Sequence, residues 1–312
     1  MLPARGRARA CTRTAVTYHV GPMAKTREIK GRMKAVGNIQ RITKTMQMIA
    51  TARFQAALKR ATASKPYSKK IAELVSELAA AAGSVDHPLL RSPATQANRR
   101  LVLVISSNRG LCGGYNANVL RAAAQRLRDH AGTNVELQVV GKKALGYFKF
   151  AGRAVDVNHA QFGDEPKYVD VQRLAESYIE QFTQGKYDSI EVVSMAFEST
   201  SRQSPRVLTL LPLQPPAVAG TSGTQAQVEY DYSPEPAVLL GELLPATVKV
   251  QLFQCFNDAV VSEQVSRMVA MKAATDAAGK MKKSLHRRYN RARQTAITTE
   301  LTEIISGSAA LE

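Results

Sequence analysis

The sequence predicts an α/β protein in which two long terminal helices form an antiparallel coiled coil. Prolines are absent from residues 25–64 and from residues 246–307, and apolar residues recur in both stretches at spacings of three and four. In the middle of the chain, short apolar runs alternate with amphipathic stretches. That alternation is typical of a domain that combines a sheet with helices.

The N-terminal helix is predicted over residues 23–82. Its expected apolar seam consists of Ala35, Ile39, Ile42, Met46, Ile49 and Ala56. Pro66 is expected to end or kink the first part of this helix, because proline lacks an amide hydrogen and clashes with the preceding turn. At about 1.5 Å per residue, that first part would reach roughly 60 Å.

The C-terminal helix is predicted over residues 246–312, with Gly279 as its only interruption. Its expected seam consists of Met271, Ala274, Ala278, Met281, Leu285, Ala292 and Thr299. Small seam residues suit close packing of two helices, and a helix of this length would extend roughly 90 Å. Two long helices at opposite termini predict an antiparallel pair that projects from a globular body.

Residues 98–212 are predicted to form a Rossmann-like α/β domain with a partly parallel sheet. The expected strands are RLVLVIS, VELQVVG, SIEVVSMAF and RVLTLLP, and the expected helices are NANVLRAAAQRLRDH, KKALGYFKF and VDVQRLAESYIEQF. Residues 213–245 are expected to be a linker rich in Pro, Gly and Ser that ends in a short helix near residues 235–243.

Residues 1–22 form a separate leader. This leader is rich in arginine, contains no acidic residue and lacks a long apolar centre. These features exclude a secretory signal and suit an organelle transit peptide. Met23 directly precedes a predicted helix, so an over-extended reading frame explains the leader equally well.

Composition narrows the classes of function. At 312 residues and 45% hydrophobic, the chain can bury a sizeable core, and no run of about 18 apolar residues predicts a membrane-spanning helix. Three distant cysteines and five dispersed histidines predict neither a disulfide framework nor a metal site. Asp164, Glu165 and Asp170 are expected to be helix caps or solvated acids. We therefore expect no catalytic residue, metal or cofactor.

The net charge of +18 is concentrated in the helical ends. Residues 25–60 carry ten Lys and Arg against one acid, and residues 280–299 carry seven against none. Such a basic helix pair would suit nucleic acid or an acidic protein partner that holds it. The two hypotheses stay open, although few aromatic side chains, essentially Phe54 and Tyr289, lie among the cations.

The glycine loop, SSNRGLCGGYN at residues 106–116, resembles a phosphate-binding loop. A Walker loop requires GxxxxGK, but Tyr115 stands at the fifth position after Gly110 and no lysine follows. A dinucleotide site requires GxGxxG and an acid at the end of the second strand, where the chain has Gly141 and two lysines. Both nucleotide interpretations therefore fail on spacing.

The glycines of this loop are better explained by a sharp turn from strand to helix. Asn116 or Asn118 is expected near the N-cap of that helix. Arg109 remains a candidate for contact with an anion or with the carboxylate of a partner.

Three motifs together resemble a known family. They are IQRITKTMQMIATARF at residues 39–54, the glycine loop, and SEQVSRMVAMKAATDAAGKMKKSLHRRYNRARQTAITTELTEIISGSAAL at residues 262–311. Their content and order resemble the gamma subunit of F-type ATP synthases, from about residue 23 to the C-terminus. The resemblance implies a central stalk within a hexamer of alpha and beta subunits, with the α/β domain on the epsilon subunit and the membrane c-ring.

The resemblance also implies roles for individual residues. Proton flow would turn the shaft, which would bias each beta subunit among its conformations without binding ATP itself. Contacts with beta subunits are implied for Lys44, Met46, Arg287, Arg288, Arg291, Arg293 and Gln294. A place near the lower mouth of the hexamer is implied for Arg109, Gly110, Cys112, Gly113 and Gly114. An apolar tip in a hydrophobic sleeve is implied for Ile304, Ile305 and Leu311.

Several segments resemble bacterial members, among them the start at Met23 and the stretches ATARF, KPY and DHPLL. We therefore expect peripheral attachment to the cytoplasmic side of a bacterial inner membrane, through partners alone. A mitochondrial member on the matrix side of the inner membrane is the alternative. A basic coiled-coil protein that binds nucleic acid or acts as a scaffold is the alternative function. The stretch FESTSRQSP lacks the two cysteines of photosynthetic members, so their redox regulation is not expected.

Overall fold

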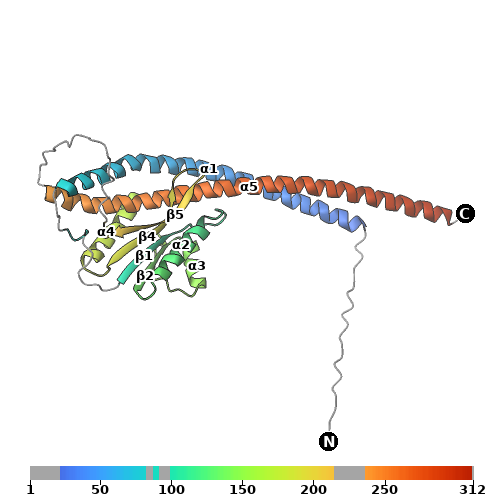
Figure 1. Ribbon diagram of the computed structural model, residues 1–312. Helices are drawn as coiled ribbons and strands as arrows, with labels where there is room; N and C mark the ends of the chain where they lie inside the picture. The colour runs from blue at the N-terminus through green and yellow to red at the C-terminus, as the bar shows by residue number, and fades with distance from the viewer. Residues whose placement is uncertain (1–21, 82–86, 91–98, 214–235, 311–312) are drawn as a thin grey trace, which may run out of the picture. The chain divides into compact units, whose positions relative to one another are not determined.

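The computed structural model describes residues 22–81, 87–90, 99–213 and 236–310 (Figure 1). Most of the predicted leader and linker, and Leu311 of the predicted tip, lie outside these residues. The chain divides into two compact units. The helix-pair unit contains the described residues up to 42 and from 274 onward, and the sheet unit contains those from 43 to 273.

Two long helices, α1 (Pro22–Ala81) and α5 (Pro236–Ala309), contribute to both units. α1 continues through Pro66, so the helix end expected there is wrong. α5 includes Pro245, so the short helix expected near residues 235–243 is its first part. A proline within a helix costs roughly 3 kcal/mol. At Pro245 the packing of Leu244 and Val248, both buried, offsets that cost.

A five-stranded sheet forms the centre of the sheet unit, in the order β3-β2-β1-β4-β5. The strands are β1 (Arg99–Ile105), β2 (Asn134–Val140), β3 (Val157–Asn158), β4 (Ser189–Phe197) and β5 (Gln203–Leu211). The first four run parallel, and β5 pairs antiparallel with β4. The intervening helices are α2 (Tyr115–Asp129), α3 (Lys142–Phe150) and α4 (Tyr168–Thr183). The predicted Rossmann-like, partly parallel α/β domain is thereby confirmed.

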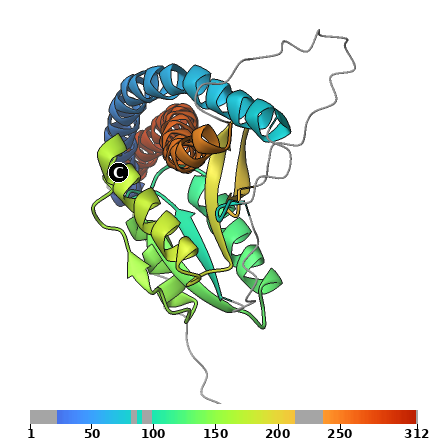
Figure 2. The same ribbon diagram turned by 90° about the vertical axis from the view of Figure 1, so that its left-hand side faces the viewer.

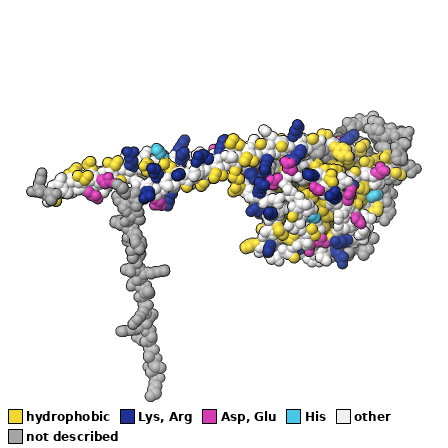
Figure 3. Space-filling view, turned by 180° about the vertical axis from the view of Figure 1, so that it is seen from behind, with side chains coloured by type: hydrophobic (Ala, Val, Ile, Leu, Met, Phe, Trp, Pro, Cys, Tyr) yellow, Lys and Arg dark blue, Asp and Glu magenta, His cyan; other side chains and the backbone are white. Residues whose placement is uncertain are grey.

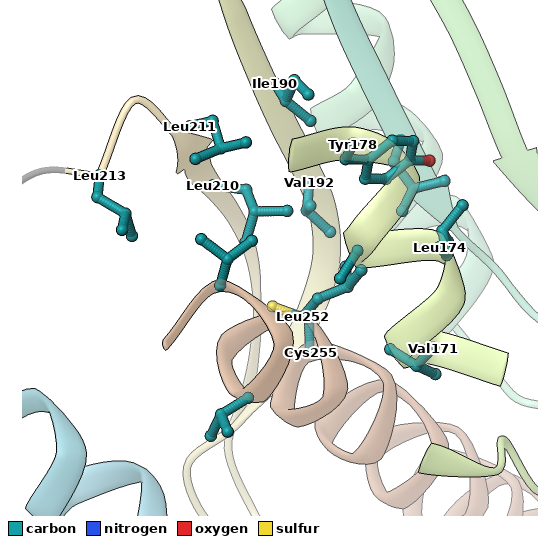
Figure 4. Packing of buried hydrophobic residues seen from close by; sticks show 14 of the residues in the cluster. Val171, Leu174, Tyr178, Ile190, Val192, Leu210, Leu211, Leu213, Leu252 and Cys255 are labelled. Carbon is teal, nitrogen blue, oxygen red and sulfur yellow. The ribbon is translucent and has the colours of Figure 1, made fainter. Parts of the chain in front are cut away.

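Helices cover both faces of the sheet (Figure 2). On one face, buried residues of β1 and β4 pack against α4 and the first part of α5, as Val192, Val171 and Leu252 illustrate in Figure 4. On the other face, Val104 and Leu137 pack with residues of α2 and α3. Because both faces are covered, the central strands are apolar on both sides, which explains the uninterrupted apolar run of β1.

Within the sheet unit, α1 packs antiparallel to α5 (Figure 1). Phe54, Ala57 and Ala61 form a buried cluster with Val261 and Val265. The apolar seam predicted for α1 is wrong. Its isoleucines Ile39, Ile42 and Ile49 are each more than half exposed. The buried positions instead include Thr43, Ala50, Ala57 and Ala61. Between residues 43 and 61, the side chains that α1 buries are small apart from Phe54. Small side chains let the two backbones approach closely, and the isoleucines lie on the outer face.

The helix-pair unit contains an antiparallel contact of the same kind. Gln40 of α1 approaches Gly279 of α5, where an added Cβ would lie 3.2 Å from the Gln40 amide nitrogen. Ala278 is buried in this unit, and Leu285 and Ala292 are half-buried, as the predicted α5 seam requires, but Met281 is exposed.

By length and composition alone, α5 contains a stretch apolar enough to cross a membrane. The first part of α5 has another explanation for its apolar character. Leu240, Leu252 and Phe256 are buried against the sheet in the main core cluster, and such a core helix is hydrophobic for packing reasons.

Candidate functional site

The glycine loop joins β1 to α2 at the carboxyl edge of the sheet. Gly114 is the N-cap of α2, and no side chain caps this helix end. Asn116 lies near that end, as expected, but its side chain binds the loop. Its Oδ1 accepts from the Ser107 amide at 3.2 Å, and its Nδ2 donates to the sulfur of Cys112 at 3.0 Å. These bonds close the loop on itself around a buried Cys112.

Helix α5 packs directly against this loop. Gly113 has a φ of +55°, and a Cβ added there would lie 3.6 Å from the Cβ of Ala270 and 3.7 Å from the carbonyl oxygen of Ser266. Arg267 of α5 donates to the Gly110 carbonyl at 3.5 Å. A helix therefore covers the loop backbone at Gly113, one of the places where a nucleotide-binding loop would approach phosphates.

A buried ion pair lies within α5 at this place. Arg267 donates to Glu263, one turn earlier, at 2.5 Å, and both side chains are about one-tenth exposed. Burial raises the pKa of Glu263, against the opposing effect of the hydrogen bond from Arg267. Burial, and the nearby charge of Glu263, raise the pKa of Tyr115 at the start of α2. Local sequence gave no sign of this pair beyond a Glu and an Arg four residues apart.

Arg109, predicted as a candidate for an external anion, has a partner within the chain. It lies 3.6 Å from Asp164, which also binds Arg53 of α1 at 2.7 Å. Glu165 pairs with Arg60 of α1 at 3.3 Å. Asp164, whose side chain is 27% exposed, is therefore not the solvated acid expected, whereas Glu165 is 70% exposed, as expected; both link the loop after β3 to α1.

Gly141, at the end of β2, stands where a dinucleotide site would carry an acid. Its φ is +95°, and an added Cβ would overlap the carbonyl oxygen of Ser106 and lie 2.7 Å from the Ser106 Oγ. That hydroxyl donates to the Val140 carbonyl at 3.0 Å and accepts from the Ala144 amide at 2.9 Å. The ends of β1 and β2 are thus bound to each other, and no acid occupies the position.

The residues implied as beta contacts lie in two groups. On α1, Lys44 is exposed and Met46 is half-buried. On α5, the exposed group consists of Arg287, Arg288, Arg291, Arg293 and Gln294. Lys and Arg side chains gather along this part of α5 in Figure 3. Within the described part of the chain, none of these arginines forms an ion pair, so their charges are available to a partner.

The end of α5 is apolar and exposed. Ile304 is 72% exposed, and Leu301 and Ile305 are each 57% exposed. No acid or base occurs from residue 304 to residue 310. A helix end of this composition has its apolar surface uncovered in the isolated chain, as expected of a surface that meets a partner.

The buried histidines have structural partners. His130 lies 3.2 Å from Glu191, which also accepts two hydrogen bonds from Arg126, and His159 bonds to Gln138 at 2.8 Å. Among the described residues, no group of three His, Cys, Asp or Glu side chains is arranged to hold a metal ion.

Fold and site together define a class of protein: an α/β domain carried on two long helices, with a helix rather than a ligand against its glycine loop. The family model of ATP synthase matches residues 25–311. The chain is also 45% identical over 298 residues to the ATP synthase gamma chain of Rhodopirellula baltica, covering 93% of this chain and 100% of the relative. It therefore belongs to the family of ATP synthase gamma chains.

Other comparisons agree with this assignment. The ATP synthase gamma chain of Leptospira biflexa is 39% identical over 291 residues, covering 93% of this chain and 100% of that relative. A chain from the mitochondrial ATP synthase of Euglena gracilis, solved as OSCP/F1/c-ring, matches with a TM-score of 0.62 at 16% identity, covering 93% of this chain and 95% of that one. A chain from the central stalk and c-ring of the Tetrahymena thermophila enzyme gives 0.53 at 18% identity, covering 75% and 99%. At such identities these structures establish the likeness of fold.

Proposed function

We propose that the chain is the central rotor shaft of an F-type ATP synthase. In this role it couples proton flow through the membrane sector to the conformational cycle of the catalytic beta subunits. The observation that carries the proposal is the match to gamma chains along almost the whole chain, from residue 25 to residue 311.

The shaft itself is non-catalytic in this proposal. The packing of α5 against the glycine loop supports it, because Ala270 and Ser266 lie against Gly113 and Arg267 binds the Gly110 carbonyl. The end of β2 carries Gly141 instead of an acid. The chain therefore acts on ATP synthesis through contacts with other subunits.

Coupling arises from contacts that change as the shaft turns. A subunit shifts a partner's conformational equilibrium only through interactions that differ between the partner's states. The exposed arginines of α5, Arg287 to Arg293, lie on one helix and therefore present their charges to different directions around its axis. On rotation, the arginines would meet the carboxylates of each beta subunit in turn. Arg293 and Gln294 would contact its catch loop.

The two ends of the shaft have different surfaces, which suit different partners. The exposed apolar end at Ile304 and Ile305, extended by Leu311, would turn in a hydrophobic sleeve of the hexamer, where an uncharged surface forms few directional bonds. On α1, Lys44 and Met46 would meet the acidic segment of beta. The loop from Arg109 to Gly114 would lie near the lower mouth of the hexamer.

Partners and location follow from the same role. The α/β domain would rest on the epsilon subunit and the c-ring, so that the chain reaches the membrane only through partners. The similarity to gamma chains from Rhodopirellula baltica and Leptospira biflexa supports a bacterial inner membrane, with the chain on its cytoplasmic side. The matrix side of a mitochondrial inner membrane is the alternative.

Co-expression tests the proposal. The chain would be produced with the alpha and beta subunits of a bacterial ATP synthase, and the purified product assayed for a stable complex and for ATP hydrolysis. We expect both, and no hydrolysis from this chain alone. A chain that ignores those subunits and binds DNA with a steep salt dependence would instead be a basic nucleic-acid-binding protein.

A further inference from the structure

A cavity of about 650 Å³ lies at the carboxyl edge of the sheet, within the sheet unit. Its walls come from α1, from the loops after β1, β2 and β3, and from α5. In open α/β sheets, ligands bind in the crevice beyond the carboxyl ends of the strands. The volume falls within the range of small-molecule sites, roughly 300–1,000 Å³.

The lining of this cavity is rich in cations. Arg53 and Arg60 come from α1, Arg109 from the glycine loop and Lys142 from the start of α3, against two carboxylates, Asp164 and Glu165. The carboxylates pair with the three arginines. Within the described part of the chain, Lys142 forms no ion pair. The cavity therefore holds two more positive charges than negative ones.

Hydrogen-bond donors also remain unused. A guanidinium offers five N–H donors, and a carboxylate engages at most two of them. The ammonium group of Lys142 adds three donors. The backbone at the start of α3 adds none, since the Lys142 amide donates to Asn108 and the Ala144 amide to Ser106. Recognition in this cavity therefore rests on side chains.

We propose that the cavity binds a small polyanion with phosphate chemistry, such as pyrophosphate or the diphosphate of a nucleotide. Arginine forks and a lysine charge are the groups that bind phosphate oxygens most strongly in proteins. The anion would connect α1 to the loops after β1 and β2, where Asp164 already holds Arg53 and Arg109. This site lies beside the start of the glycine loop, away from Gly113, which α5 covers, and the inference goes beyond the proposed rotor function.

Equilibrium dialysis of the purified full-length chain with radiolabelled pyrophosphate tests the proposal. We expect one saturable site per chain. Lys142→Gln should weaken its affinity about tenfold, since a hydrogen bond to a charged group is lost. Lys149→Gln is the matched control, because Lys149 lies on the same helix, is exposed and does not line the cavity. That control should bind as the unmodified chain does.

Arg109→Gln, also exposed, provides a second test should Lys142→Gln disturb the fold, which the melting temperature would reveal. A parallel titration with ADP distinguishes a site for inorganic pyrophosphate from a site for the diphosphate of a nucleotide. Equal affinity for ADP and pyrophosphate means that phosphates alone are recognised, and tighter binding of ADP means that the nucleoside contributes. The proposal is overturned by binding that does not saturate, or by equal losses in Lys142→Gln and Lys149→Gln, which would indicate only general attraction to a basic protein.

Discussion

Substitution of Gly141 by alanine should severely destabilise the sheet unit. The φ of +95° and ψ of 141° at this residue belong to a region that side chains rarely adopt, at a cost of roughly 1–3 kcal/mol. The new Cβ would also overlap the carbonyl oxygen of Ser106. That oxygen belongs to the residue directly after the central strand β1, and forcing it aside costs roughly 1–3 kcal/mol more. The sum, about 2–6 kcal/mol, is a large part of the 5–15 kcal/mol that typically stabilises a domain.

Gly132 provides the matched control. Its φ is +100°, but nothing lies within 4 Å of an added Cβ, so Gly132→Ala should carry only the conformational cost of roughly 1–3 kcal/mol. The comparison separates backbone strain from overlap with β1.

Urea unfolding of the full-length chain measures both variants. The chain has ten tyrosines and no tryptophan, and Tyr178 and Tyr187 are buried in the sheet unit. Near-ultraviolet circular dichroism of tyrosine therefore reports this unit with little contribution from the exposed part of α5. If Gly141→Ala loses no more stability than Gly132→Ala, the tight junction between β1 and β2 is refuted.

Three further predictions follow from other parts of the chain. Burial tends to raise the pKa of Glu191, but hydrogen bonds from Arg126 and His130 outweigh it, so the pKa is lowered in the folded chain. The carboxylate of Glu191 therefore stabilises the fold fully above its ordinary pKa of 4.5. This stabilisation is lost as the pH falls through the lowered pKa of the folded state. Glu191→Gln should lower the free energy of unfolding by about 1–3 kcal/mol at pH 7 and reduce its fall below pH 4.5. If urea titrations show the same fall at acid pH in the variant, this interpretation is wrong. Arg293→Ala combined with Gln294→Ala should lower coupled ATPase activity and proton pumping of the assembled complex without changing the melting temperature of the chain, and unaltered pumping would contradict the assigned contact. Removal of residues 295–312 should weaken assembly without abolishing it, because the α1–α5 contact in the sheet unit remains; complete loss of the complex on gel filtration would speak against that.

The elements of the α/β domain could be predicted from sequence because their signals are local. The helix α3 has the expected bounds, Lys142–Phe150, and β1 is apolar throughout because helices cover both faces of the sheet. These features depend on residues that are neighbours along the chain.

The seam of α1 could not be predicted in the same way. Hydrophobicity favours Ile42 and Ile49 as buried positions, yet Thr43 and Ala50 are buried in their place. Which face of α1 is buried depends on how closely α5 approaches it. That distance is a property of the two helices together and not of either helix alone. In a rotor, the exposed isoleucines would form part of the surface that meets other subunits.

The contacts around the glycine loop were missed for a related reason. Asp164 binds arginines 55 and 111 positions away, Arg109 and Arg53, and Arg267 reaches a carbonyl 157 positions away. No local pattern identifies such partners. From sequence alone Asp164 is therefore expected to be solvated, although it binds both α1 and the glycine loop within the sheet unit.

Rotation of the chain is the most direct test of the central claim. Alpha and beta subunits assembled with this chain would be fixed to a surface, and a fluorescent rod attached to the exposed end of α3 would be followed after addition of ATP. If the chain is the rotor, the rod should turn stepwise in one direction and stop when ATP is exhausted. ATP hydrolysis by the same complex with a stationary rod would contradict it.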